Sequence, residues 1–108
     1  MSIEQVDKID FISTTSNGKV QLTISDHLEW NDEENHLLIL QNKLNAYLSF
    51  IESGQILESY STALNKDVII SIVMKYEPTE NSSIFLNNCK NFLEKNGYEF
   101  KWEVLQDK

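Results

Sequence analysis

Histidine and carboxylate side chains gather in one stretch of the chain, and they are the residues best suited to chemistry. The stretch contains Asp26, His27, Glu29, Asp32, Glu33 and His36. Imidazole nitrogens and carboxylate oxygens bind divalent metals such as zinc. A zinc-binding helix usually presents two ligands four residues apart, whereas Glu33 and His36 are three residues apart. The spacing matches no metal motif, so we predict neither a metal site nor a cofactor.

Two interpretations of this stretch remain open. In the first, an acidic surface docks a basic protein, as small immunity or adaptor proteins do, and its residues are Glu29, Trp30, Asp32, Glu33 and Glu34. In the second, a small-molecule or metal-binding site, with or without enzymatic activity, uses Asp26, His27 and His36. The concentration of carboxylates beside a tryptophan favours the first interpretation.

No motif for nucleophilic catalysis or phosphate binding is present. The chain has three glycines, too few for a phosphate-cradling loop, and no serine lies in a glycine-flanked elbow. Cys89, the single cysteine, shares a predicted helix face with Phe85 and Phe92, which is typical of a buried apolar thiol. We therefore predict no catalytic residue and favour a non-enzymatic protein.

The charge of the chain excludes one large class of partners. The formal net charge is −8, and every one of the nine basic residues is a lysine. Nucleic-acid binding relies on positive charge and commonly on the planar guanidinium of arginine. We therefore expect no nucleic-acid partner, and a basic protein fits the charge better. Nothing in the sequence indicates a homo-oligomer.

Apolar segments are short throughout the chain. Residues 1–8 carry charges and no apolar signal region, and the longest apolar-dominated run, Val68 to Met74, is far too short to span a bilayer. We expect a cytoplasmic protein with no membrane contact, and a single domain over residues 1–108.

The elements that position the acidic stretch begin with a long helix between Asn31 and Gly54. Its apolar residues recur at three- and four-residue steps, at Leu37, Leu40, Leu44, Tyr47, Leu48 and Ile51. Asn31 is predicted to cap the helix in a capping box with Glu34, and Gly54 to end it.

Strands are predicted before the helix, from Ile9 to Ser16 and from Lys19 to Ser25. They flank Asn17-Gly18, which is typical of a two-residue hairpin turn. That turn sets Phe11 opposite Ile24 and places both in the core.

Three more strands and a second helix follow the long helix. The strands are predicted at Gln55–Tyr60, Asp67–Tyr76 and Tyr98–Leu105, and the helix at Glu80–Asn96. The order β-β-α-β-β-α-β predicts a two-layer α+β sandwich, with two helices on one face of a five-stranded, mostly antiparallel sheet. The strand order remains open between 1-2-5-4-3 and a ferredoxin-like 5-2-4-3.

Several segments of the first 60 residues resemble a family of small bacterial domains of unknown function. They are Ile9 to Ile12, Leu22 to Leu28 with Trp30, His36 to Leu38, Leu40 to Tyr47, and Phe50 to Gly54. The resemblance implies a bacterial source and a stand-alone domain, and it supplies no catalytic residue.

Overall fold

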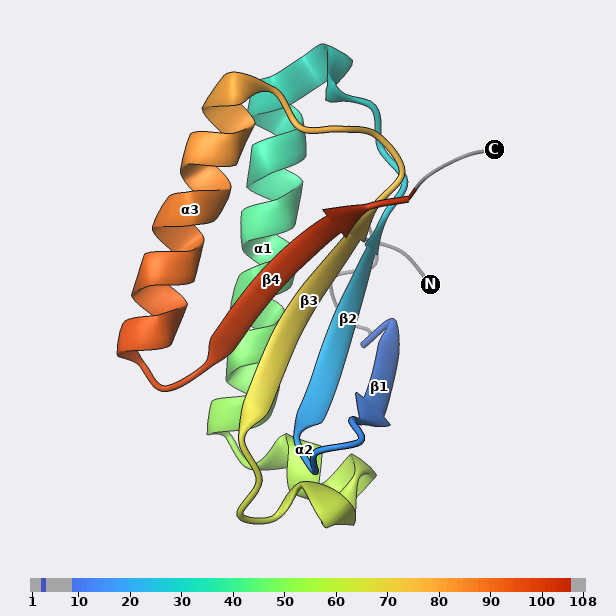
Figure 1. Ribbon diagram of the computed structural model, residues 1–108, viewed down its shortest axis with the longest axis vertical. Helices are drawn as coiled ribbons and strands as arrows, with labels where there is room; N and C mark the ends of the chain where they lie inside the picture. The colour runs from blue at the N-terminus through green and yellow to red at the C-terminus, as the bar shows by residue number, and fades with distance from the viewer. Residues whose placement is uncertain (1–2, 4–8, 106–108) are drawn as a thin grey trace.

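The sheet has four strands and the helices cover one of its faces. The computed structural model describes residue 3 and residues 9–105, so the predicted charged segment at residues 1–8 lies outside the described residues apart from Ile3. The strands lie side by side in chain order, and they are β1 (Phe11–Thr14), β2 (Val20–Asp26), β3 (Val68–Met74) and β4 (Glu99–Val104). The β1 strand is antiparallel to β2, whereas β2, β3 and β4 are parallel (Figure 1).

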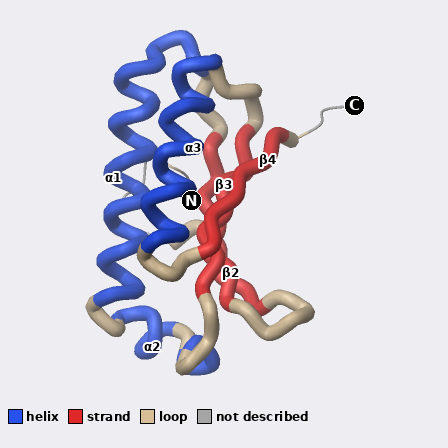
Figure 2. The backbone as a smooth tube through the Cα atoms, turned by 60° about the vertical axis from the view of Figure 1, so that its left-hand side comes forward, coloured by secondary structure: helices blue, strands red, loops and turns tan. Residues whose placement is uncertain are grey.

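Three α-helices complete the described part of the chain. They are α1 (Glu33–Glu52), α2 (Gln55–Ser59) and α3 (Glu80–Lys95), with short 3-10 turns at Trp30–Asp32 and Ser61–Ala63. The long helices α1 and α3 lie beside each other on one face of the sheet (Figure 2). The predicted α+β class is confirmed.

The prediction of a fifth strand at Gln55–Tyr60 is wrong, because this segment forms α2. The Tyr60 amide donates to the Ile56 carbonyl at 2.7 Å, a bond between residues four apart. Ile56 is 4% exposed and packs into the core from this short helix. The short apolar pair Ile56-Leu57 followed by Tyr60 is compatible with a strand, but residues 56, 57 and 60 equally suit one helical turn.

Both predicted strand orders and the mostly antiparallel pairing are also wrong. The chain runs from β2 through α1 to the neighbouring β3, and from β3 through α3 to the neighbouring β4. Two crossovers of the same hand that step in the same direction cover the same face of a sheet. Both helices can therefore lie on one face while the strands follow one another in chain order, and the last strand need not lie next to the first hairpin.

The first hairpin is shifted by one residue from the predicted register. The Thr15 amide donates to the Lys19 carbonyl, and Gly18 adopts a φ of 83°, so the loop has three residues and ends on a left-handed glycine. Phe11 consequently lies opposite Thr23 on the uncovered face of the sheet, where it is 60% exposed. A one-residue shift moves every side chain of a strand to the other face.

The core lies between the sheet and the two long helices. Its fully buried side chains include Val20, Leu22, Ile24, Leu40, Tyr47, Ile70, Ile72 and Leu86. On α1, the apolar stripe is interrupted by two buried polar side chains, His36 and Lys43. Among the described residues, no helix is both long and apolar enough to cross a membrane.

Candidate functional site

Two acidic stretches, distant in sequence, meet at one end of the molecule. Because α1 and α3 each follow a parallel strand, both helices begin at the same end (Figure 1). The stretches are residues 29–34 and 75–80, and we call the surface that they form the acidic end. Its carboxylates are Glu29, Asp32, Glu33, Glu34, Glu77 and Glu80, and its one lysine is Lys75.

Two side-chain hydrogen bonds join these stretches directly. The Trp30 Nε1 donates to the Tyr76 carbonyl at 3.3 Å, and the Thr79 hydroxyl donates to a Glu33 carboxylate oxygen at 2.8 Å. Thr79 also caps α3, because its hydroxyl oxygen accepts from the Ser82 amide at 3.0 Å. The start of α1 is therefore fastened to the start of α3.

The cap of α1 differs by one residue from the prediction. Asp32, not Asn31, occupies the cap position and accepts from the Asn35 amide at 3.4 Å. Asn31 instead lies in the 3-10 turn that precedes the helix. The predicted capping box between Asn31 and Glu34 is therefore absent, and the Glu34 side chain is exposed.

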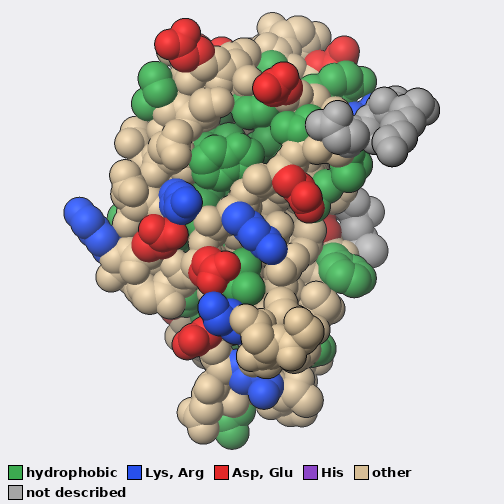
Figure 3. Space-filling view, in the orientation of Figure 1, with side chains coloured by type: hydrophobic (Ala, Val, Ile, Leu, Met, Phe, Trp, Pro, Cys, Tyr) green, Lys and Arg blue, Asp and Glu red, His purple; other side chains and the backbone are tan. Residues whose placement is uncertain are grey.

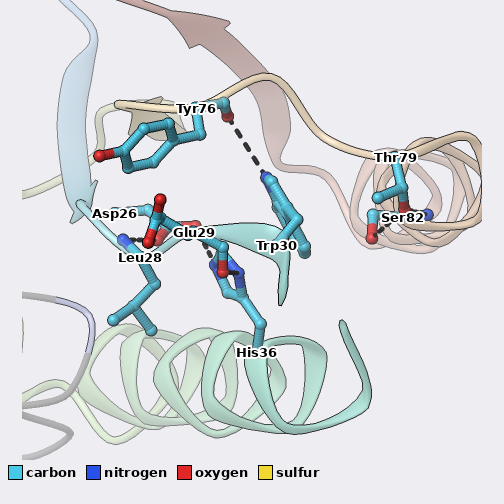
Figure 4. Close-up of polar contacts among 8 residues, drawn as sticks. All are labelled: Asp26, Leu28, Glu29, Trp30, His36, Tyr76, Thr79 and Ser82. Atoms are coloured by element: carbon cyan, nitrogen blue, oxygen red, sulfur yellow. Dashed lines mark hydrogen bonds and ion pairs between the residues drawn. The ribbon is translucent and has the colours of Figure 1, made fainter. Parts of the chain in front are cut away.

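Beneath the acidic end, Asp26 and His36 form a buried polar pair (Figure 4). The His36 Nε2 lies 2.7 Å from Asp26 Oδ2, and the two side chains are 2% and 1% exposed. The His36 Nδ1 donates to the Glu29 carbonyl at 3.1 Å, since a carbonyl can only accept. The Trp30 ring stacks on the imidazole with a centroid separation of 3.6 Å.

This arrangement fixes the role of the pair. Both ring nitrogens of His36 are occupied, and the other Asp26 oxygen accepts from the Leu28 amide at 3.1 Å. The pair therefore ties the end of β2 to the turn before α1 and to α1 itself. We call Asp26, His36 and Trp30 the latch.

The predicted docking residues fall into two groups. Glu29, Asp32 and Glu34 are exposed, whereas Trp30 and Glu33 are half-buried in the contacts just described. In Figure 3, acidic side chains are seen at the top of the molecule, where Figure 1 places the starts of α1 and α3, and others lie beside the lysines farther down.

Of the residues in the alternative ligand site, the structure brings Asp26 and His36 together and leaves the His27 side chain exposed. Asp26 and His27 also line a wide hollow of about 880 Å³ at the carboxyl ends of β2 and β3, together with Lys75 and Tyr76. In the described part of the chain, no group of three or more His, Cys, Asp or Glu side chains is arranged to hold a metal ion.

A second buried polar cluster was not predicted from the sequence. The Lys43 Nζ lies 2.9 Å from Asp10 Oδ1, and the side chains are 0% and 4% exposed. The Tyr47 hydroxyl accepts from the Asp10 amide at 2.9 Å and donates to the Thr23 carbonyl at 2.8 Å. Burial raises the pKa of the Tyr47 phenol. The other Asp10 oxygen accepts from the Ser25 amide, so the cluster fastens α1 to the edge of β2 beside β1.

One signal in the sequence could have identified this cluster. Lys43 follows His36 by seven residues and precedes Tyr47 by four, so it shares the face of α1 that packs on the sheet. A lysine on an apolar helix face needs a buried acidic partner. The partner, Asp10, lies at the start of β1 and became identifiable only from the fold.

The fold and the site define an α+β domain with a latched, acidic end. The chain belongs to a family of unknown function, DUF6572, whose profile matches residues 1–106. No curated protein and no solved structure matches the chain.

Proposed function

We propose that the protein is a non-enzymatic interaction module that docks a basic partner protein at its acidic end, in the manner of immunity or adaptor proteins. The observation that carries this proposal is the meeting of six carboxylates and a single lysine from residues 29–34 and 75–80. The bonds from Trp30 to Tyr76 and from Thr79 to Glu33 hold the two stretches together.

The helix dipoles do not cancel this negative charge. Each helix start carries a partial positive charge of about half an elementary charge, so the starts of α1 and α3 together offset about one carboxylate. Lys75 offsets another. A clear excess of negative charge therefore remains on a surface that includes the exposed Glu29, Glu34, Glu77 and Glu80. Such a surface attracts a basic partner and speeds its association.

The latch supports docking by holding the surface in one shape. Asp26, His36 and Trp30 are engaged with each other and with the backbone around them. A surface that is already ordered loses less conformational freedom when a partner binds. The acidic end is therefore better suited to recognition than the same charges on a loose loop.

Charge reversal tests the proposal. The variant Glu34→Lys/Glu80→Lys changes two exposed side chains of the acidic end, and Glu58→Lys/Glu94→Lys makes the same charge change on exposed residues of α2 and late α3. Wild type and both variants are used to capture basic proteins from source cells at low and high salt. We expect the first variant to lose the partner and the second to keep it.

Salt provides the second readout of the same experiment. Exposed charges are screened over about 8 Å at physiological ionic strength, so binding should weaken as salt rises. Helix-dipole effects on stability are about 0.3–1 kcal/mol per charge, so the reversed variant remains folded. A partner whose binding ignores both salt and the reversal at Glu34 and Glu80 contradicts the proposal.

The alternative is a ligand site in the hollow beside Asp26 and His27. The position favours it, because ligands of α/β sheets often bind outside the carboxyl ends of parallel strands. The polar atoms of Asp26 and His36, however, are already engaged with each other and with the backbone. We expect no thermal shift with zinc, nickel or manganese. A shift that disappears in His27→Ala favours the ligand site instead.

A further inference from the structure

A groove runs between α1 and α3 on the side of the helix layer away from the sheet. Its volume is about 340 Å³, and its apolar lining includes Leu48, Phe85 and Cys89. Phe92 stands at the groove with 60% of its side chain exposed. The two helices lie beside each other in both backbone views (Figures 1 and 2).

The chemistry of this groove differs from that of the rest of the surface. Charged residues make up 24% of the chain, yet none lines the groove. Its polar lining consists of amides, among them Gln41, Asn45 and Asn88. Neutral amides around an apolar floor accept a packed helix or side chain without the cost of desolvating a charge.

Beyond the groove, the same side of α1 continues toward the acidic end. Leu38 is 55% exposed and precedes Gln41 by three residues and Asn45 by seven, so it extends the apolar stripe along the same side of α1. Glu34 precedes Gln41 by seven residues, which is two helical turns, and lies on that side too. The stripe therefore runs from a carboxylate at the start of α1 to the groove at its middle.

A second copy of this chain is poorly suited to the groove. Each copy carries a net charge of −8, and pairing through the α1 and α3 face sets acidic helix starts close to a strongly negative partner. A basic partner meets the charge of the acidic end instead. The surface therefore matches a partner segment that has apolar side chains in its middle and positive charge at one end.

We propose that the groove binds an amphipathic helix of the basic partner, with its apolar side chains between α1 and α3 and its Lys or Arg residues at the acidic end. The inference rests on the proposed function and specifies the partner's docking segment. From Glu34 to Leu48 the distance along α1 is roughly 21 Å, so the partner helix has about 14 residues or slightly more. Its anchors recur at three- and four-residue steps, as in other helices that bind grooves.

A peptide selection tests this inference. Random 18-residue peptides displayed on phage are selected on wild-type protein, and the recovered peptides are synthesised. We expect them to carry apolar residues at three- and four-residue steps and to have lysine or arginine clustered at one end. The selection is unbiased, so peptides without this pattern, or no binders above background, overturn the inference.

Groove variants locate the binding of the selected peptides. Phe92→Ala removes an exposed groove side chain, and Asn88→Glu introduces a charge at an exposed groove position. Phe11→Ala is the matched control, because Phe11 is also 60% exposed and lies on the uncovered face of the sheet, away from the groove. We expect each groove variant to weaken binding at least tenfold and the control to leave it unchanged. Equal binding by all three contradicts the inference.

The single cysteine reports occupancy directly. Burial raises the pKa of the Cys89 thiol, so its alkylation by a maleimide is slow and is followed at mildly alkaline pH. A peptide in the groove should slow the alkylation further, and an unchanged rate places the peptide elsewhere. Sedimentation of the free protein serves as a further check, because a dimer that protects Cys89 makes a second copy the occupant and overturns the inference.

The two proposals fail in different ways. If the partner is lost with Glu34→Lys/Glu80→Lys but kept with Phe92→Ala and Asn88→Glu, the acidic end docks the partner and the groove inference is wrong. If the partner is lost with Phe92→Ala and Asn88→Glu but its binding ignores both salt and Glu34→Lys/Glu80→Lys, the groove docks the partner and the charge-based function is wrong.

Discussion

Replacing His36 with leucine tests whether the latch holds the acidic end in place. The imidazole lies 2.7 Å from the Asp26 carboxylate, and both side chains are almost fully buried. His36→Leu places an apolar group of similar size in α1 and removes the partner of Asp26. The carboxylate then retains the Leu28 amide as its one donor among the described residues.

The size of the effect follows from burial. Removing the hydrogen-bond partner of a buried carboxylate costs about 3–5 kcal/mol, because the negative charge is left uncompensated. The lost stacking of Trp30 on the ring adds about 0.5–1.5 kcal/mol, and the leucine side chain recovers part of that by packing. We expect a loss of about 3–5 kcal/mol, a large part of the roughly 5–15 kcal/mol of a small domain.

Urea unfolding followed by far-UV circular dichroism measures the loss. Trp30 fluorescence is avoided, because the substitution removes the ring on which Trp30 stacks. Asn42→Leu is the control, since Asn42 is an exposed polar residue of the same helix, and it should cost below about 1 kcal/mol. Adding Asp26→Asn to His36→Leu removes the stranded charge and should recover part of the loss. Two results would contradict the role of the latch: a cost below about 1 kcal/mol for His36→Leu, or effects of His36→Leu and Asp26→Asn on the free energy of unfolding that simply add in the double variant.

Four further outcomes are expected from denaturant unfolding. Lys43→Met should cost about 3–5 kcal/mol by leaving Asp10 buried without its cation, and a loss under about 1 kcal/mol would show that the pair is not buried in solution. Burial raises the pKa of the Tyr47 phenol in the folded state above its value of about 10 in the unfolded chain. The neutral phenol therefore stabilises the fold fully below pH 10, and this contribution to the free energy of unfolding is lost as the pH rises above 10. Tyr47→Phe should make the fall in stability above pH 10 less steep. Gly18→Val should cost at least about 1–2 kcal/mol, because the φ of 83° at Gly18 is unfavourable for a residue with a Cβ atom. An unchanged stability would mean that the turn lies at other residues. Leu44→Ala should cost about 2–5 kcal/mol, and a much smaller loss would remove Leu44 from the core.

The long helix was predictable because several independent signals agree over many residues. The apolar periodicity marks its body, and Gly54 with a φ of 83° ends it as expected. The cap was off by one residue because Asn31 and Asp32 are equally good capping residues. The choice between them depends on the 3-10 turn and on the stacking of Trp30 against His36, which are tertiary contacts.

The register of the first hairpin was not predictable from Asn17-Gly18 alone. The pair suits a two-residue turn, and it equally suits the last two positions of a three-residue loop that ends on a left-handed glycine. The Thr15 side chain favours the longer loop, because its hydroxyl oxygen accepts from the Lys19 amide at 3.0 Å. The exposure of Phe11 follows from that single shift.

The error in topology came from one short segment. With Gln55–Tyr60 taken as a strand, the chain between β2 and β3 no longer formed a simple crossover, and antiparallel arrangements became plausible. As a helix, α2 extends that crossover, and a long helical connection between adjacent strands implies parallel pairing. The burial of β3 on both faces, from Val68 to Ser71, is typical of such a central parallel strand.

The topology also explains why only half of the candidate site could be predicted from the sequence. Residues 29–34 were recognisable as an acidic stretch, but residues 75–80 join them only because both helices leave the same end of a parallel sheet. The same geometry sets α1 and α3 parallel, so both acidic helix starts lie at the same end of the groove between them. An antiparallel connection would separate Glu80 from Glu34 by the length of a helix. The acidic end and the groove are thus two results of one arrangement, and a partner that uses both must be basic at one end of its docking helix and apolar along one face.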